Sequence, residues 1–254
     1  MNATPLPRIR IDDLEWEVLG THGLRRKVLA FDPSDQHVTS LVDIPRGWHG
    51  GGVAHFHHAF EEVYMVGGSV TVGGTHYWHA GDYFYRPAMI VHGHDERSEE
   101  GARALIRSDG PLELLLIHKP AEPDEYSLEP IKDGRGHVYD VTPSELAWTT
   151  SPDLPNGWRM KLLSADQTTG TRTYMAEVPA GWTGDGSTKR PAPWEATVLK
   201  GALKGASHTY EAGDYSYGPG GRECFDAESS TDGATLLVWE FPHDRKSFAC
   251  APRG

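Results

Sequence analysis

What this sequence lacks excludes several classes of protein. It contains two cysteines, Cys224 and Cys250, which could form one disulfide at most, and thiols this few and this distant are typical of a reduced chain. Its 24 Lys and Arg are outnumbered by 36 Asp and Glu, and this acidic balance repels nucleic-acid phosphates. No apolar run approaches the roughly 18–20 residues of a membrane helix, and residues 1–10 contain no hydrophobic signal segment. We therefore expect a soluble cytoplasmic protein that binds neither nucleic acid nor membrane.

Glycine and proline, by contrast, are plentiful and separate short apolar runs. The chain has 29 Gly and 18 Pro, and no helical period is sustained for long. The first half predicts short strands, with turns at Gly67-Gly68, Gly73-Gly74 and Ala80-Gly81-Asp82; the expected strands are residues 38–44, 62–66, 69–72, 83–86, 104–107 and 112–118. Regular short strands with glycine turns are typical of an all-β sandwich or barrel.

The sequence contains an internal repeat. The clearest repeat is HYWHAGDYFYRP at residues 76–87, which returns as HTYEAGDYSYGP at residues 208–219. VDIPRGW at residues 42–48 likewise returns as AEVPAGW at residues 176–182. The Pro- and acid-rich stretch 119–136 reads as a linker. We therefore predict two domains, residues 1–132 and residues 133–254.

Histidines are concentrated in the first half. Eight of the 14 lie between residues 49 and 94. His55 and His57 are two residues apart, so on a strand they point to the same side. Glu61 follows after three residues and His92 lies further on, and together they could close a site of three imidazoles and one carboxylate.

The spacing of these residues resembles the two motifs of the cupin superfamily. His55, His57, Glu61 and Gly68 match the first motif, and Gly81, Pro87 and His92 match the second. The second motif departs from the family at Met89, where an inner Gly is usual, and at Glu96, where Asn is usual. The sequence of residues 55–74 also resembles the cupins of anti-sigma factors and of dioxygenases that cleave diketones or hydroxyacetophenones. The resemblance implies an all-β chain of two tandem cupin (jelly-roll-like) β-barrels.

The same resemblance implies one divalent metal ion per chain, with His55, His57, Glu61 and His92 as its ligands. Imidazole and carboxylate together accept Fe, Zn, Mn, Ni or Cu, so the ligand types alone do not choose the metal. Fe(II) is favoured by the resemblance to dioxygenases.

The second half lacks this ligand set although it keeps the glycines and proline of the scaffold. Alignment of the two halves places Thr188, Arg190, Trp194 and Cys224 where the first half has His55, His57, Glu61 and His92. A single thiol does not hold a metal. We therefore predict that residues 133–254 form a barrel without a metal site.

Strand parity assigns further residues around the site. Val63 and Met65 share the parity of Glu61 and should line the cavity, whereas Glu62 should point away from it. His94 lies two residues after His92 and is the candidate general base; the alternatives are a role in supporting the metal ligands or a solvated loop position. Arg107 is expected at a solvated strand position.

Three functions use such a site differently. The first is a non-haem Fe(II) dioxygenase that cleaves a C–C bond in a small diketone or hydroxyketone, with His94 accepting the enol proton. The second is a redox-neutral metal-dependent isomerase, lyase or decarboxylase acting on a small polar acid or sugar. The third is a non-enzymatic zinc-binding or sensing cupin. The first is the preferred hypothesis. The expected partners are a small-molecule substrate and a second copy of the chain in a homodimer.

Overall fold

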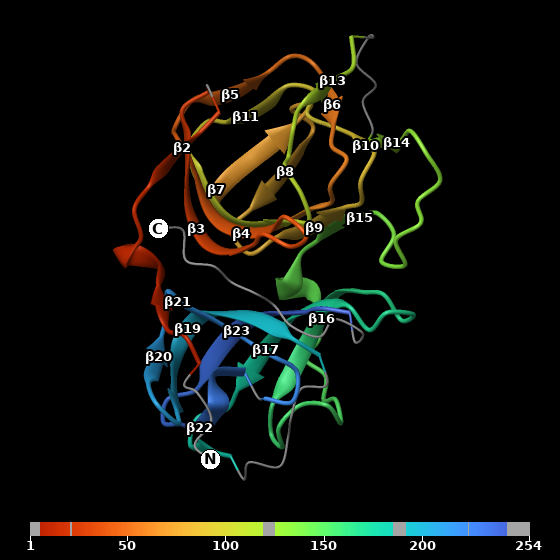
Figure 1. Cartoon of the computed structure of the whole chain (residues 1–254). Coiled ribbons are helices and arrows are strands. Elements are labelled where there is room, and N and C mark those ends of the chain that lie inside the picture. Colours follow the sequence, from red (N-terminus) through yellow and green to blue (C-terminus); the bar gives the residue numbers. More distant parts are fainter. Residues whose placement is uncertain (1–5, 21, 119–124, 185–191, 223, 243–254) are drawn as a thin grey trace. The chain divides into compact units, whose positions relative to one another are not determined.

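The computed structural model describes residues 6–20, 22–118, 125–184, 192–222 and 224–242. These residues form strands and three short 3-10 segments, with no α-helix among them. No helix within this part of the chain is both long and apolar enough to cross a membrane. The expectation of an all-β chain with two tandem β-barrels is confirmed (Figure 1).

The first barrel is built on a ten-stranded antiparallel sheet. Its central strands run in the order β15-β9-β7-β12-β4-β3-β2, and β5, β8 and β11 attach at one side. Two further pairs, β6 with β13 and β10 with β14, complete it. The strands are β2 (Glu17–Leu19), β3 (Leu24–Asp32), β4 (His37–Ile44), β5 (Trp48–Gly51), β6 (His55–Phe56), β7 (Glu61–Val72), β8 (His76–His79), β9 (Tyr83–Arg86), β10 (Ile90–Val91), β11 (Glu96–Ser98), β12 (Ala102–Ser108), β13 (Leu115–Leu116), β14 (Tyr126–Ser127) and β15 (Val138–Val141).

The second barrel repeats this plan in a nine-stranded sheet, with the central order β1-β21-β19-β23-β17-β16. Its central strand β19 has the same length as β7 of the first barrel. The elements are β1 (Ile9–Arg10), η1 (Ile11–Asp13), η2 (Pro143–Glu145), β16 (Arg159–Ala165), β17 (Arg172–Val178), β18 (Trp182–Thr183), β19 (Trp194–Gly205), β20 (Thr209–Glu211), β21 (Asp214–Gly218), η3 (Cys224–Asp226), β22 (Ala227–Ser230) and β23 (Ala234–Glu240).

The two compact units do not simply follow one another along the chain, because the N-terminal residues belong to the same unit as the second half. One unit contains residues 14–144, and the other contains residues 6–13 together with the described part of 145–242. β1 pairs with β21, so the start of the chain belongs to the second barrel, while β15 pairs with β9 of the first. The compact units thus do not divide at the predicted boundary of residues 132 and 133. The described part of the expected linker, from Glu125 onward, supplies β14 to the first barrel, which corrects its interpretation as a linker.

The predicted turn at Gly67-Gly68 is instead part of one long strand. β7 continues through both glycines, and its pairing with β12 shifts register between Arg103 and Ala104. Gly68 has φ +69°, and a Cβ there would overlap the carbonyl oxygen of Gly101. The shift leaves Val66 as the extra residue of a bulge. Two residues further on, the positive φ and the close approach of the Gly101 carbonyl at Gly68 admit only glycine. The second barrel repeats the device at Gly201.

Candidate metal centre

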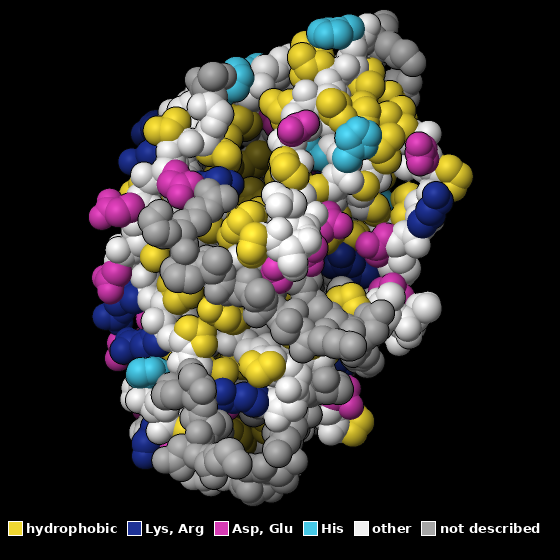
Figure 2. All heavy atoms as spheres, viewed as in Figure 1, with side chains coloured by type: hydrophobic (Ala, Val, Ile, Leu, Met, Phe, Trp, Pro, Cys, Tyr) yellow, Lys and Arg dark blue, Asp and Glu magenta, His cyan; other side chains and the backbone are white. Residues whose placement is uncertain are grey.

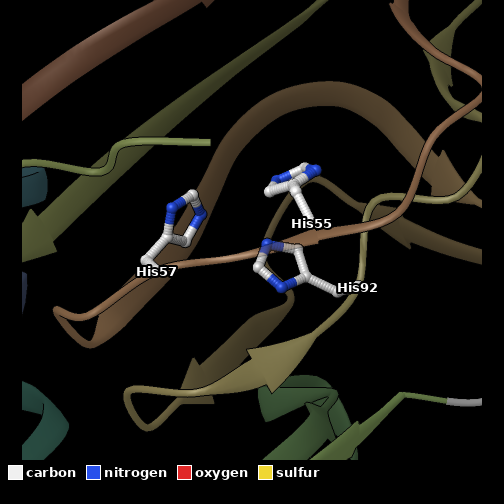
Figure 3. A group of neighbouring side chains, drawn as sticks. All are labelled: His55, His57 and His92. Atoms are coloured by element: carbon white, nitrogen blue, oxygen red, sulfur yellow. The ribbon is translucent and has the colours of Figure 1, made fainter. Parts of the chain in front are cut away.

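Three buried imidazoles meet inside the first barrel (Figure 3). His55 lies on β6 and His92 follows β10, and the backbones of these two residues exchange hydrogen bonds of 2.8 Å in both directions. His57 points to the same region from two residues beyond His55. One ring nitrogen from each histidine lies within 4.8 Å of the others. Gly93 makes room for the His55 ring, because a Cβ at Gly93 would overlap it.

The hydrogen bonds of two of these rings fix which nitrogen faces the centre. His57 Nδ1 lies 2.9 Å from the carbonyl oxygen of Glu113, and His92 Nδ1 lies 2.9 Å from that of Ile90. A carbonyl only accepts, so each Nδ1 carries the proton and each Nε2 keeps a lone pair, which is the usual arrangement for metal-bound histidine. Burial lowers the pKa of His55, His57 and His92, so the neutral form that binds metal is favoured.

Glu61 stands beside the three histidines at the start of β7. Its Oε2 lies 3.5 Å from His92 Nε2 and accepts a hydrogen bond of 2.8 Å from Arg86 Nη1. Burial opposes ionisation, but Arg86 and His57 lower the pKa of Glu61 overall. Three neutral nitrogen donors with an ionised carboxylate next to them fit a divalent transition metal. The predicted ligands are thus brought together, with the carboxylate also tied to an arginine.

Arg86 is the centre of a buried ion-pair network. It is 3% exposed and binds Glu125 through Nε and Nη2, at distances of 2.6–3.0 Å, while also holding Glu61. Glu125 lies 2.9 Å from His137 Nε2. Burial opposes this charge too, but Arg86 and His137 lower the pKa of Glu125 to about 2. The network leaves two ionised carboxylates on one guanidinium beside the three histidines.

The three histidines, Glu61 and Arg86 line a cavity of about 340 Å³ in the first barrel. The other walls are mainly apolar and include Val63 and Met65, which confirms the parity prediction for both. Figure 2 shows a hollow with hydrophobic inner walls in the upper part of the view. Apolar side chains also stand at the rim, where Leu114 is half exposed. Glu96 of β11 lines the same cavity.

The remaining predictions have different outcomes. Glu62 points to the opposite face of β7, as expected, and its carboxylate binds Tyr83 and Arg107. The solvated position expected for Arg107 is wrong, because this residue is 3% exposed and ion-paired with Glu62. His94 is half-buried and is not among the cavity-lining residues; its carbonyl accepts a hydrogen bond from the Gly73 amide. A catalytic role for His94 stays a prediction.

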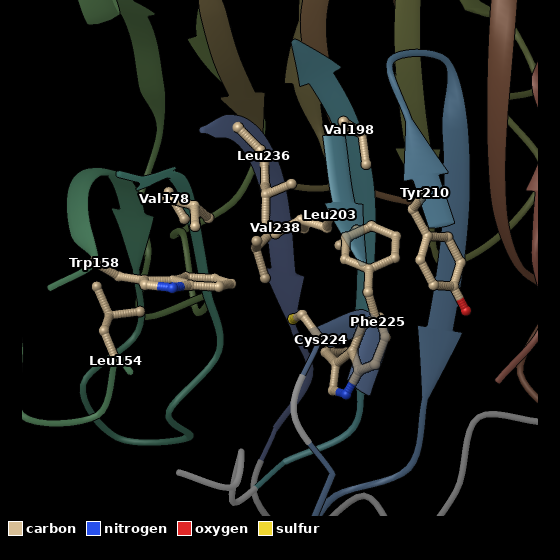
Figure 4. Packing of buried hydrophobic residues seen from close by; sticks show 14 of the residues in the cluster. Leu154, Trp158, Val178, Val198, Leu203, Tyr210, Cys224, Phe225, Leu236 and Val238 are labelled. Atoms are coloured by element: carbon tan, nitrogen blue, oxygen red, sulfur yellow. The ribbon is translucent and has the colours of Figure 1, made fainter. Parts of the chain in front are cut away.

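The corresponding region of the second barrel is a packed apolar core (Figure 4). Trp194 occupies the first position of β19, as Glu61 does on β7, and it is fully buried near Phe225, with ring centroids 6.0 Å apart. Cys224 is completely buried. Thr188, Arg190 and Cys250 lie outside the described residues. Among the residues that are described, the one group of metal-binding side chains is that of the first barrel.

The sequence analysis did not assign Arg86, Glu125 or Glu96 to the site. Arg86 ends the strand YFYR, whose four residues are all buried, and an arginine in such a run is a signal that a buried acidic partner exists. Glu125 gives no such signal, because it lies in a stretch whose composition is that of a linker. Glu96 stands out in the sequence only as a departure from the family motif.

Comparison with known proteins agrees with this architecture. The family model described as "ChrR Cupin-like domain" matches twice, at residues 7–112 and 138–243. A crystal structure from Nostoc punctiforme PCC 73102, named "putative dioxygenase", superposes with a TM-score of 0.76 at 17% identity, covering 98% of this chain and 87% of that one. An oxalate decarboxylase from Bacillus subtilis superposes with a TM-score of 0.53 at 14% identity, covering 94% and 78%. No curated protein matches the sequence. At these identities, the similarity to solved structures shows the fold alone.

Proposed function

Because the chain belongs to the ChrR cupin-like family, we propose that its first barrel is a metal-dependent enzyme, a non-haem Fe(II) dioxygenase that cleaves a C–C bond in a small diketone or hydroxyketone. The observation that carries the proposal is the cluster of three neutral, buried imidazoles on the wall of an apolar cavity. The Nostoc punctiforme protein, named "putative dioxygenase", is compatible with this proposal.

The histidines and Glu61 would hold the ion. Bound there, a divalent ion supplies a Lewis acid that lowers the pKa of a ketone and, as Fe(II), a centre that reacts with O₂. Arg86 keeps Glu61 ionised and in place, and the hydrogen bonds of His57 and His92 to backbone carbonyls keep their rings oriented.

The cavity walls provide substrate selection and exclude water. A ketone with an apolar substituent buries that substituent against side chains such as Val63, Met65 and Phe84. At about 25 cal/mol per Å² of apolar surface, a buried phenyl or short alkyl group contributes roughly 2–3 kcal/mol before the cost of binding. A dry cavity also strengthens the electrostatic effect of Arg86 and of the carboxylates.

Metal analysis combined with O₂ uptake tests the proposal. Protein purified anaerobically, without chelators or nickel affinity resin, is analysed by plasma mass spectrometry and then offered 1,3-diketones and 2-hydroxyketones. We expect close to one Fe per chain, and O₂ uptake accompanied by formation of the carboxylic acid products of C–C cleavage. Both the iron and the activity should be lost in His57→Ala. Tightly held Zn without turnover of any ketone would refute the oxidative function and favour a sensing role.

A further inference from the structure

A second carboxylate faces the cavity without a fixed partner. Glu96 begins β11, which pairs with β5 at Gly51. The neighbouring Gly50 leaves room for it, because a Cβ there would lie 3.2 Å from Glu96 Oε2 and 2.6 Å from Trp48 Cη2. Glu96, Glu61 and the three histidines all line the same cavity. Glu96 therefore borders the cavity that a substrate would occupy.

The charges that line the cavity differ in how they are engaged. Glu61 is held by Arg86, and Arg26, the other arginine of the lining, pairs with Glu17. No hydrogen bond or ion pair to the Glu96 carboxylate is found among the described residues. An acid that is free to change its partner is what proton transfer requires.

The surroundings of Glu96 allow its carboxyl group both to accept and to donate a proton. Burial raises the pKa of Glu96 to about 7. Of the charged and titratable groups that face it, Arg86 and His57 favour ionisation, while Glu61 and Glu125 oppose it. Near neutral pH, the group is thus available both as a base and as an acid. His94 has no comparable position, since it does not line the cavity.

We propose that Glu96 is the acid–base catalyst of this site, acting on neutral ketones with an apolar substituent; this inference rests on the proposed function. The Glu96 carboxylate removes the proton from the carbon next to the substrate carbonyl. The C–H bond breaks and an O–H bond forms on Glu96. The electron pair of the broken bond forms a C=C bond to the carbonyl carbon, and the π pair of the carbonyl moves to its oxygen to give the enolate. The proton returns by the reverse step.

The same arrangement defines the substrate class. Both arginines of the lining are paired with carboxylates, so neither guanidinium is left for a carboxylate substrate. An ionised Glu96 further disfavours small dianionic acids such as oxalate. A ketone enters uncharged and becomes anionic only after Glu96 has taken its proton.

The test is exchange of the α-protons of 2-hydroxyacetophenone in D₂O, followed by proton NMR without O₂ so that no oxidative step contributes. We expect exchange by the wild-type holoprotein, with a rate that rises with pH as the Glu96 carboxyl group ionises. Glu96→Gln should slow it by about 100-fold or more and flatten the pH profile, with metal content unchanged. Glu96→Asp should retain an intermediate rate. Glu99→Gln, the same change at an exposed position on this edge, should match the wild type, and oxalate should not compete.

The outcomes separate this inference from the proposed function. Wild-type exchange rates in Glu96→Gln, or no exchange by the wild type with any ketone, would overturn the role of Glu96. Loss of exchange in His94→Asn but not in Glu96→Gln would also overturn it and would assign the proton to His94. Exchange that depends on Glu96 in a protein that takes up no O₂ would support Glu96 and refute the oxidative function.

Discussion

Replacement of Arg86 by methionine tests the buried network directly. The substitution keeps an unbranched side chain of similar length and removes the charge that holds both Glu61 and Glu125. Two buried carboxylates would lose their arginine, and only Glu125 would keep a basic neighbour, His137. Removing one partner of a buried ion pair costs about 3–5 kcal/mol, because the other charge stays uncompensated. We expect a loss of this size in the free energy of unfolding of the metal-free protein.

The matched control is Arg25→Met, which breaks an ion pair to Asp43 on the surface of the same barrel. Arg25 is about half exposed, and such pairs contribute roughly 0–1 kcal/mol. Urea denaturation of both variants, followed by tryptophan fluorescence, gives the comparison, and Arg86→Met combined with Glu125→Gln should recover part of the loss. Equal effects of the two methionine substitutions would refute the reasoning, since the network would then carry no more energy than a surface pair.

Three further predictions address the bulge, the metal and the cavity acid. Gly68→Ala should destabilise the first barrel by at least about 2 kcal/mol in urea denaturation, because of its positive φ and the overlap with a backbone carbonyl, whereas Gly67→Ala should be close to neutral. His92→Ala should lose its metal in elemental analysis, whereas Cys224→Ala should keep full occupancy; retained metal in the former would remove His92 from the ligand set. The raised pKa of Glu96 means that the folded state holds its proton more tightly than the unfolded state, so this contribution to stability is present below about pH 4.5 and is lost as pH rises through about 7. In chemical denaturation of the metal-free proteins, the stability of Glu96→Gln relative to wild type should therefore increase over this pH range, and a constant difference would contradict the raised pKa.

The fold could be predicted from sequence because its signals are local and appear twice. The period-2 parity of a short strand is enough to place Val63 and Met65 on the cavity wall, where both side chains lie. The error at Gly67-Gly68 has a physical cause, since glycine supplies positive φ both to turns and to bulges within strands, and the sequence does not distinguish them. The error at Arg107 arises because burial of an arginine depends on a partner, Glu62, on another strand.

The candidate site divides in the same way between local and distant residues. His55, His57 and His92 follow from spacing, because parity and one pair of neighbouring strands bring them together. Glu125 does not, since it reaches Arg86 from a segment far along the chain that has no apolar pattern of its own. A contact of this kind is decided by how the chain returns to the barrel, which local periodicity does not encode.

The two barrels together indicate which features belong to the scaffold and which to the chemistry. The glycine bulge is kept at Gly68 and at Gly201, so it serves the barrel itself. The position of Glu61 is kept as well, but in the second barrel it holds Trp194, which is completely buried in an apolar core. Where the metal-binding side chains are absent, the same strand position is thus used for packing. A buried ionic network is energetically costly compared with such a core. Under the proposed function, the chemistry of the cavity rather than stability accounts for the presence of Glu61, Arg86 and Glu125 in the first barrel.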